Sequence, residues 1–290
     1  MDEFPRTIVG GVSVSRLIIG TNWMLGWSHT SAAWDHWIKE YQSRDRIADV
    51  LEVFLRAGVD TLMGPPNDLM IEAVHAAEDR VGRKMILALT PNFSTRPEGP
   101  NKDVGYGPPE YWPEEAFDIC KKMGATFAMP HAAVTDALMD RRAGTIRDLP
   151  LYTKMIRERE MVPGLSTHSP QTPVYCSNNQ YDIETYIQLY NAMGFLMHVE
   201  PDWAMRVIKN AEKPCMCIKP LAAGRLLPPV GLAFVWNTIR DQDMVVCGTA
   251  LPAEAREVIE LSLDFLNRRI PSLELQYTRS KAELRGMADR

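Results

Sequence analysis

The 290-residue sequence lacks several patterns that mark large classes of proteins. It has no cluster of Lys and Arg, and its formal net charge is −5. Both facts argue against a nucleic-acid partner, because phosphate binding needs clustered positive charge. No run of about 18 apolar residues is present, so we expect neither a transmembrane helix nor a membrane partner. The acidic start, residues 1–5, lacks the basic and apolar regions of a signal peptide.

Cysteine is scarce and follows no disulfide or cluster pattern. The five cysteines are an odd set, and Cys215 and Cys217 alternate within one apolar segment, which indicates packing. No Cys-x-x-Cys-x-x-Cys run is present, which excludes an iron–sulfur extension of that type. Such sparse cysteines are typical of a reducing compartment, so we predict a cytoplasmic protein.

Apolar residues make up 46% of the chain, and they recur in eight strand-like segments that alternate with helical patterns. The predicted strands are 17–22, 58–63, 84–90, 125–130, 162–167, 185–190, 215–220 and 244–248. The predicted helices are 44–57, 67–81, 113–123, 148–160, 201–212, 229–241 and 252–268. This alternation predicts an α/β fold, a single (β/α)8 TIM barrel that covers residues 1–290 as one domain. A doubly wound sheet is disfavoured, because no Gly-x-Gly-x-x-Gly motif follows the early strands.

Several segments stand outside this alternation. Two β-prone runs flank a Gly-Gly pair within residues 6–16, which predicts an N-terminal β-hairpin that plugs the barrel. The crossover 169–184 is polar and contains two prolines, which favours a loop. Residues 23–43, with four tryptophans, and 91–112, with five prolines, are long loops of the kind that are often functional. The charged tail, 270–290, has a helical pattern and is predicted to pack outside the barrel.

Seven short motifs occur in the order and at the spacing of one known family. They are 14–21, Asp60–Thr61, Met129–His131, Gly164–His168, Gln188–Asn191, Lys219–Leu226 and Val246–Thr249. On these motifs the chain resembles the aldo-keto reductase superfamily over most of its length. The resemblance implies a barrel, a nicotinamide cofactor (NADP or NAD) and reduction of a small carbonyl compound.

The departures from that family concern its catalytic groups. A tyrosine normally follows the Asp-Thr of the second strand and acts as general acid, but residues 62–68 contain none. The family lysine of the third strand is also absent, and Thr90 or a neighbour stands in its place. The segment 250–258, which in the family clamps the adenine end of NADP, has no Asn and only Arg256 for a phosphate. We therefore predict weak NADP binding and slow carbonyl reduction by the ordinary route.

Functional groups of a barrel lie at the carboxyl ends of its strands. We predict Asp60, His131 and Lys219 as catalytic residues and expect them to converge with His168 on one pocket. Asp60 is alternatively a structural acid. The predicted substrate-binding residues are Trp23, Trp27, Asn92, His168 and Asn191. As cofactor-binding residues the resemblance implies Ser166, Gln188, Tyr190, Leu221, Gly224, Arg225, Gly248, Thr249 and Arg256. Tyr190 would either floor the nicotinamide or act as a relocated acid.

Three functions fit these residues. The first is a divergent aldo-keto-reductase-like oxidoreductase with a rebuilt site, acting on a small carbonyl, sugar-like or aromatic substrate. The second is a non-redox lyase, isomerase or hydrolase, with a divalent metal held by Asp60, His131 and His168 as one version; no separate metal site is assigned. The third is an inactive barrel that binds a small molecule. All three predict a small-molecule partner and leave the oligomeric state open.

Overall fold

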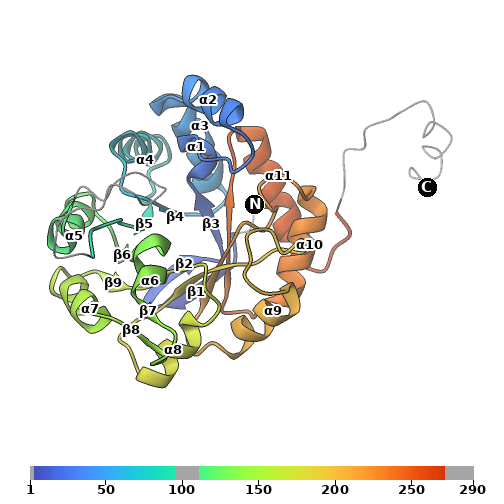
Figure 1. The fold of residues 1–290 in the computed structure, drawn as a ribbon. Coiled ribbons are helices and arrows are strands. Elements are labelled where there is room, and N and C mark those ends of the chain that lie inside the picture. Colours follow the sequence, from blue (N-terminus) through green and yellow to red (C-terminus); the bar gives the residue numbers. More distant parts are fainter. Residues whose placement is uncertain (1–2, 96–110, 272–290) are drawn as a thin grey trace, which may run out of the picture.

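Parallel strands ringed by helices form a nearly closed barrel in the computed structural model, which describes residues 3–95 and 111–271 (Figure 1). In these residues the sheet has nine short strands in the order β10-β11-β12-β13-β3-β4-β5-β6-β9. Their bounds are β3 (Leu17–Gly20), β4 (Thr61–Gly64), β5 (Ile86–Leu89), β6 (Phe127–Ala128), β9 (Val162–Pro163), β10 (Leu165–Ser166), β11 (Tyr186–Leu189), β12 (Cys215–Ile218) and β13 (Met244–Gly248). The predicted TIM-barrel fold is confirmed.

The two ends of the sheet order meet at Gly164. β9 pairs with β6 and β10 pairs with β11, and only Gly164 separates β9 from β10 along the chain. A Cβ atom at this position would lie 2.7 Å from Cγ2 of Thr185 and 2.9 Å from Cγ of Met129. Glycine therefore permits the close approach at which the predicted strand 162–167 divides in two.

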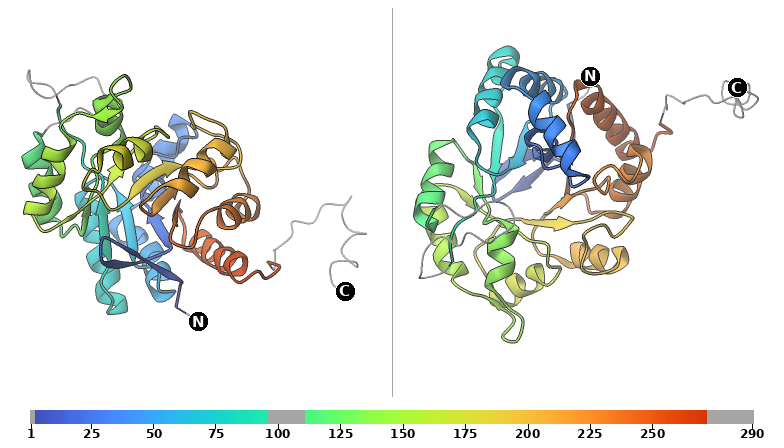
Figure 2. Two further views of the ribbon diagram at one scale, coloured as in Figure 1. Left: turned by 90° about the horizontal axis from the view of Figure 1, so that it is seen from below. Right: turned by 45° about the horizontal axis from the view of Figure 1, so that its top comes forward.

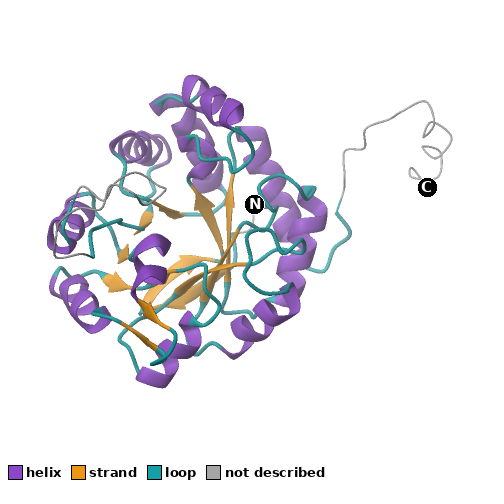
Figure 3. Ribbon diagram, in the orientation of Figure 1, coloured by secondary structure: helices purple, strands orange, loops and turns teal. Residues whose placement is uncertain are grey.

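Helices cover the outside of the barrel (Figure 3). They are α3 (Arg44–Arg56), α4 (Asp68–Val81), α5 (Pro113–Lys122), α7 (Leu149–Glu158), α8 (Thr172–Asn179), α9 (Pro201–Asn210), α10 (Pro228–Thr238) and α11 (Pro252–Leu266). The short helix α6 (Ala132–Leu138) lies inside this ring (Figure 1). The seven predicted helices are all present. The crossover 169–184 was expected to be a loop, but it contains α8. Pro173 does not prevent this helix, because it lies in the first turn, where the backbone N–H that proline lacks has no partner within the helix.

The tryptophan-rich segment 23–43 is also more helical than expected. It contains most of α1 (Asn22–Leu25) and all of α2 (Ala32–Tyr41). Ser31 begins α2 by accepting a hydrogen bond from the backbone N–H of Trp34 at 3.2 Å. This N-cap satisfies a donor that has no partner within the helix.

The N-terminal hairpin closes the amino end of the barrel (Figure 2). It consists of β1 (Arg6–Val9) and β2 (Val12–Ser15), joined by Gly10 and Gly11 with φ of +53° and +81°. Both glycines adopt the left-handed conformation that a two-residue hairpin turn requires. Val9 and Val14 belong to the same buried cluster as Phe127 of β6, so the predicted hairpin fills the barrel from below.

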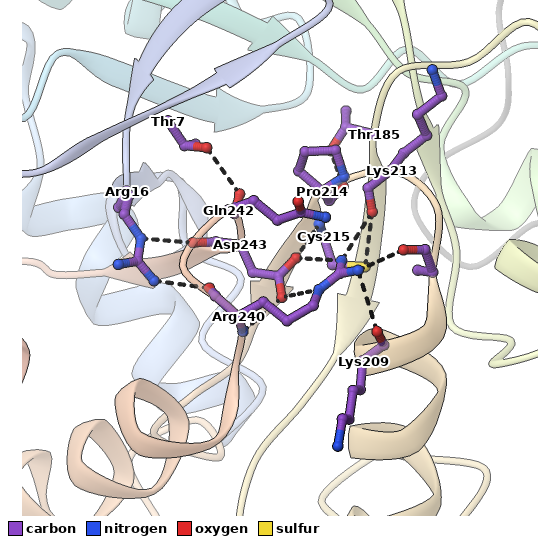
Figure 4. Close-up of polar contacts among 11 residues, drawn as sticks. Thr7, Arg16, Thr185, Lys209, Lys213, Pro214, Cys215, Arg240, Gln242 and Asp243 are labelled. Atoms are coloured by element: carbon purple, nitrogen blue, oxygen red, sulfur yellow. Dashed lines mark hydrogen bonds and ion pairs between the residues drawn. The ribbon is translucent and has the colours of Figure 1, made fainter.

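A buried ionic network ties three strands together at this amino end (Figure 4). Asp243, which is fully buried, accepts hydrogen bonds from the backbone N–H of Cys215 at 2.9 Å and from Arg240 Nη2 at 2.7 Å. Arg16 donates through Nε to the carbonyl oxygen of Asp243 at 3.1 Å. Since these residues flank β3, β12 and β13, the network fixes the strands where the polypeptide enters them.

A second hairpin, β7 (Met139–Asp140) with β8 (Thr145–Ile146), lies between α6 and α7. No helix in the described ranges is both long enough and apolar enough to cross a membrane. The predicted tail helix 270–290 falls outside the described residues, apart from its first two positions.

Candidate functional site

Two adjoining cavities open at the carboxyl ends of the strands. The larger, of about 270 Å³, is called the groove, and the smaller, of about 120 Å³, is called the polar pocket. They share one wall, which consists of Asn22, Trp27, His29, Met63, Ile218 and Lys219. A ligand in the groove would therefore touch the same side chains as a ligand in the polar pocket.

The polar pocket is lined by residues that directly follow barrel strands. Thr90 and Asn92 follow β5, His131 follows β6, Ser166 and His168 end or follow β10, and Lys219 follows β12. His131, His168 and Lys219 thus come together as expected. Ser166, expected at the cofactor, lies in this pocket instead.

Lys219 and His29 form the centre of the shared wall. Lys219 Nζ lies 3.3 Å from His29 Nε2, and both residues adopt left-handed backbone conformations, with φ of +59° and +58°. His29 Nδ1 lies 2.9 Å from the carbonyl oxygen of Trp27, so its proton is on Nδ1 and Nε2 accepts from the ammonium. Burial lowers the pKa of Lys219 from its ordinary 10.5 to about 8. Non-glycine residues held in this conformation are often found at functional sites.

His131 is a neutral hydrogen-bond donor at ordinary pH. It caps α6, and its Nδ1 accepts from the backbone N–H of Ala133 at 3.2 Å, which leaves the ring proton on Nε2. Burial, together with the nearby His168, lowers the pKa of His131 to about 4. The imidazole can therefore donate a hydrogen bond to a ligand oxygen in the polar pocket without being charged.

His168 is held in place by Asp136 of α6. The Asp136 carboxylate accepts from the backbone N–H of His168 at 3.1 Å and from the hydroxyl of Thr167. Burial, followed by the charge of Lys219, lowers the pKa of His168 to about 4. Burial acts oppositely on Asp136 and raises the pKa of its carboxyl. Asp136 thus does not line the pocket but positions His168, which does.

The groove runs between the loop 219–228, the segment after β3 and the first turn of α11. Gly224 and Gly248 line the groove beside Trp23: a Cβ atom on either would lie 3.7 or 3.4 Å from that indole. Thr21 and Thr249 line the groove, and no partner among the described residues reaches their buried hydroxyls. Of the predicted cofactor and substrate residues, Trp23, Trp27, Leu221, Gly224, Gly248 and Thr249 all line this groove.

The far end of the groove is acidic. Glu254 and Glu257, both on α11, line it. Oε2 of Glu254 accepts from the backbone N–H groups of Ala250 at 2.7 Å and of Leu251 at 3.2 Å. These amides are the donors that a helix N-terminus otherwise offers to an anion. The carboxylate of Glu254 therefore occupies the place beside these two amides where an anion could bind.

Asp60 lies elsewhere. β4 begins at Thr61 instead of 58, so Asp60 is at the amino end of the barrel. Its carboxylate accepts from Arg6 Nη1 at 2.8 Å and from Arg83 Nη2 at 3.0 Å. The expected convergence of Asp60 with the pocket is wrong, and its contacts fit the structural alternative.

The sixth strand of the barrel, β11, turns its predicted site residues away from both cavities. Ile187 points into the barrel, so Gln188 and Tyr190 face the surrounding helices. Tyr190 is fully buried and its hydroxyl bonds to Thr238 at 2.9 Å. Asn191 instead fixes a turn through two bonds with the backbone of Phe195. Gln188 and Tyr190 thus face the same way, outward from the barrel, and neither lines the groove or the polar pocket.

The two predicted cofactor arginines also lie outside the linings of the cavities. Arg225 donates to the carbonyl oxygens of His29 and Ala222, and its guanidinium stacks on Phe195 at 4.1 Å. It thereby holds the strained backbone of His29. Arg256 is exposed on α11 and does not line the groove.

Sequence reasoning missed His29, Asp136 and the two glutamates of α11 as site residues. His29 lies in the tryptophan-rich segment that the sequence already indicated as functional, so its presence between two tryptophans was an available signal. Asp136 and Glu254 act through backbone amides of distant or capped segments, which no spacing pattern predicts. Among the described residues, no cluster of three His, Cys, Asp or Glu is arranged to hold a metal ion.

Comparisons with known proteins match the fold alone. No protein-family model and no curated protein matches the chain. A Pseudomonas aeruginosa protein assigned to the aldo-keto reductases aligns with 90% of this chain and 95% of its own, at 14% identity and a TM-score of 0.62. The aldo-keto reductase of Bombyx mori in complex with NADP covers 92% of both chains, at 11% identity and 0.58. The holo form of a Bacillus halodurans aldo-keto reductase covers 94% and 99%, at 14% identity and 0.55. The barrel therefore has the aldo-keto reductase fold.

Proposed function

We propose that the protein is an oxidoreductase that binds a nicotinamide dinucleotide in the groove and a small carbonyl compound or its alcohol in the polar pocket. The observation that carries this proposal is the shared wall between the two cavities. A two-substrate reaction needs both reactants held in contact, and Lys219 and His29 line both cavities. The aldo-keto reductase fold of the chain supports the same function by analogy.

The groove fits the sugar and nicotinamide parts of a dinucleotide. The buried hydroxyls of Thr21 and Thr249 offer hydrogen bonds that no described residue accepts or donates. Gly224 and Gly248 also line the groove and present backbone without a side chain to a ligand. The acidic end does not fit a 2′-phosphate, because Glu254 and Glu257 would repel it and the amides of Ala250 and Leu251 are already bonded to Glu254. NAD(H) is therefore the dinucleotide that these residues favour, since a carboxylate can accept from a ribose hydroxyl.

When bound, the nicotinamide would supply or accept the hydride. The side chains of the polar pocket handle the oxygen of the substrate. His131 donates from Nε2 to the carbonyl oxygen, and this hydrogen bond strengthens as negative charge develops there. Lys219, whose pKa of about 8 leaves it mostly protonated at neutral pH, then delivers the proton. Lys219 would thus do what the missing tyrosine does in the family. The alternative in which Asp60, His131 and His168 hold a divalent metal is disfavoured, because Asp60 lies at the other end of the barrel from the two histidines.

The test is a fluorescence titration of the wild-type protein with NADH and NADPH, followed by two matched variants. Thr249→Val removes a buried hydroxyl that lines the groove, whereas Ser262→Ala removes a buried hydroxyl on α11 that does not line it. We expect NADH to bind, Thr249→Val to weaken it about fivefold, and Ser262→Ala to leave the affinity unchanged. Failure of both dinucleotides to bind would refute the proposed function.

A further inference from the structure

The polar pocket contains the ammonium of Lys219, which is half-buried and has no carboxylate partner among the described residues. Lys219 Nζ is bonded to a neutral imidazole, that of His29. Neither Asp nor Glu occurs among the described residues that line this pocket. The carboxylate of Asp136 accepts hydrogen bonds from Thr167 and from the backbone of His168, and that of Asp35 accepts from Ser28. An ammonium that is partly removed from water without a carboxylate partner loses hydration without gaining an ion pair, so an anion in the pocket would compensate that loss.

We propose that the polar pocket binds the carboxylate of a small 2-oxo or 2-hydroxy acid, with the Lys219 ammonium as its counterion. This proposal rests on the proposed function for the reaction, but not for the binding itself. It names the class of substrate that the same site would take.

The donors around the pocket match a carboxylate. Besides the ammonium, the imidazole of His131 lines the pocket, and the amides of Asn22 and Asn92 can donate hydrogen bonds. The cavity, at about 120 Å³, is well below the roughly 300–1,000 Å³ of pockets for drug-sized ligands. Only a compact anion fits such a volume.

A carboxylate beside the reacting carbonyl also suits the chemistry. In a 2-oxo acid the carbonyl oxygen and one carboxylate oxygen lie side by side, so one ammonium contacts both. During reduction the hydride pair forms a C–H bond, the C–O π bond breaks, and the proton from Lys219 Nζ goes to the oxygen. A bound reduced dinucleotide would supply the hydride pair, so the 2-oxo acid would become a 2-hydroxy acid with atoms and electrons in balance.

The binding should depend on pH in one direction. Only protonated Lys219 attracts an anion, so affinity should fall roughly tenfold per pH unit above its pKa of about 8. The other titratable or charged groups near it are His29, His131 and His168, with His198, Arg225, Asp35 and Asp136 beyond them. Histidines with lowered pKa values stay neutral in this range and do not produce the fall.

The experiment is isothermal titration with oxamate and with its neutral isostere oxamide, each with and without saturating NADH. Inorganic phosphate is a third probe, since it separates a carboxylate site from a general anion site. Lys219→Met is compared with Lys213→Met, because the ammonium of Lys213 is already bonded to Glu184 at 3.1 Å, away from the pocket. We expect oxamate to bind, oxamide and phosphate to bind at least about tenfold more weakly, and only Lys219→Met to abolish the difference.

Several results would overturn the proposal. Equal binding of oxamide, tighter binding of phosphate, or unchanged oxamate binding by Lys219→Met would each do so. A borohydride-stable adduct of pyruvate on Lys219 would also count against it, because the amine would then act as a nucleophile. Oxamate binding without any NADH binding would refute the proposed function and leave the carboxylate site intact. NADH binding without any oxamate binding would refute the carboxylate site and leave the proposed function intact.

Discussion

The two ends of the barrel carry opposite arrangements of charge. At the amino end each buried carboxylate has partners: Asp243 is bonded to Arg240 and a backbone amide, and Asp60 to Arg6 and Arg83. At the carboxyl end Lys219 is half-buried beside neutral imidazoles, and the described lining of the polar pocket has no carboxylate. Paired charges hold strands together, whereas a charge in a cavity that has no carboxylate partner can bind a ligand of opposite charge. We therefore interpret Asp243 and Asp60 as structural groups and Lys219 as a functional group.

The amino end should be the most sensitive to loss of a charge. Asp243→Ala leaves the guanidinium of Arg240 and the N–H of Cys215 without their acceptor, so we expect about 3–5 kcal/mol of lost stability. Urea denaturation followed by circular dichroism measures this loss. Asp241→Ala, at a fully exposed carboxylate 3.7 Å from Arg16, should change stability by less than about 1 kcal/mol. Equal effects of the two substitutions would remove the structural half of the comparison.

Acid should weaken the carboxyl end through its neutral histidines. The pKa values of His131 and His168 are lowered from 6.5 to about 4, so between these values the unfolded chain binds more protons than the folded one. Stability should therefore fall as the pH drops from 6.5 to about 4, by about 2 kcal/mol in total after allowance for partial exposure. The His131→Asn/His168→Asn double variant should lose most of this dependence. His75→Asn, on the exposed face of α4, should retain it.

Asp60 should matter for stability and not for binding. Asp60→Asn weakens two charge-assisted hydrogen bonds that are partly exposed, so we expect a loss of about 1–2 kcal/mol. Oxamate and NADH affinities should match those of the wild type. Asp45→Asn, at an exposed carboxylate bonded to Arg44, is the control and should change stability by less than about 0.5 kcal/mol. A large loss of ligand affinity in Asp60→Asn with normal stability would return Asp60 to the functional site.

Lys219 should show the smallest stability effect, with the opposite sign. Lys219→Met replaces a half-buried charge by an apolar side chain of similar length, so the free energy of unfolding should stay level or rise by up to about 1 kcal/mol. Thermal and urea denaturation at neutral pH provide the measurement. A clear destabilisation would mean that Lys219 has a structural partner, and the contrast between the two ends would then disappear.

The fold was accessible from the sequence because its signals are local. The apolar periodicities predict the eight barrel strands, and the Gly-Gly pair predicts the hairpin. The position of a residue directly after a strand was enough to bring His131, His168 and Lys219 to one pocket. Asp60 was misplaced because its strand begins at Thr61, and the start of a strand is a weaker signal than its existence. Tyr190 was misplaced because alternation shows that two residues share a face but not which face is inside.

The acidic end of the groove was harder still. The absence of basic residues near Arg256 was visible in the sequence and led to the prediction of weak NADP binding. The bonds from Glu254 to the amides of Ala250 and Leu251 depend on how the first turn of α11 closes, which the sequence does not indicate. Side chains that bond to backbone amides are missed when only side-chain pairs are considered.

If the groove and the polar pocket form one site, a ligand in one cavity must change the affinity of the other cavity for its ligand. A calorimetric titration of NADH with and without saturating oxamate tests this expectation most directly, because coupling between two ligands is reciprocal and needs a shared contact. A dinucleotide against Lys219 and His29 would exclude water from the pocket and strengthen the bond between ammonium and carboxylate. We predict that oxamate tightens NADH binding about fivefold or more. NADH affinity that is the same in the presence and absence of bound oxamate would contradict the claim that the two cavities form one site.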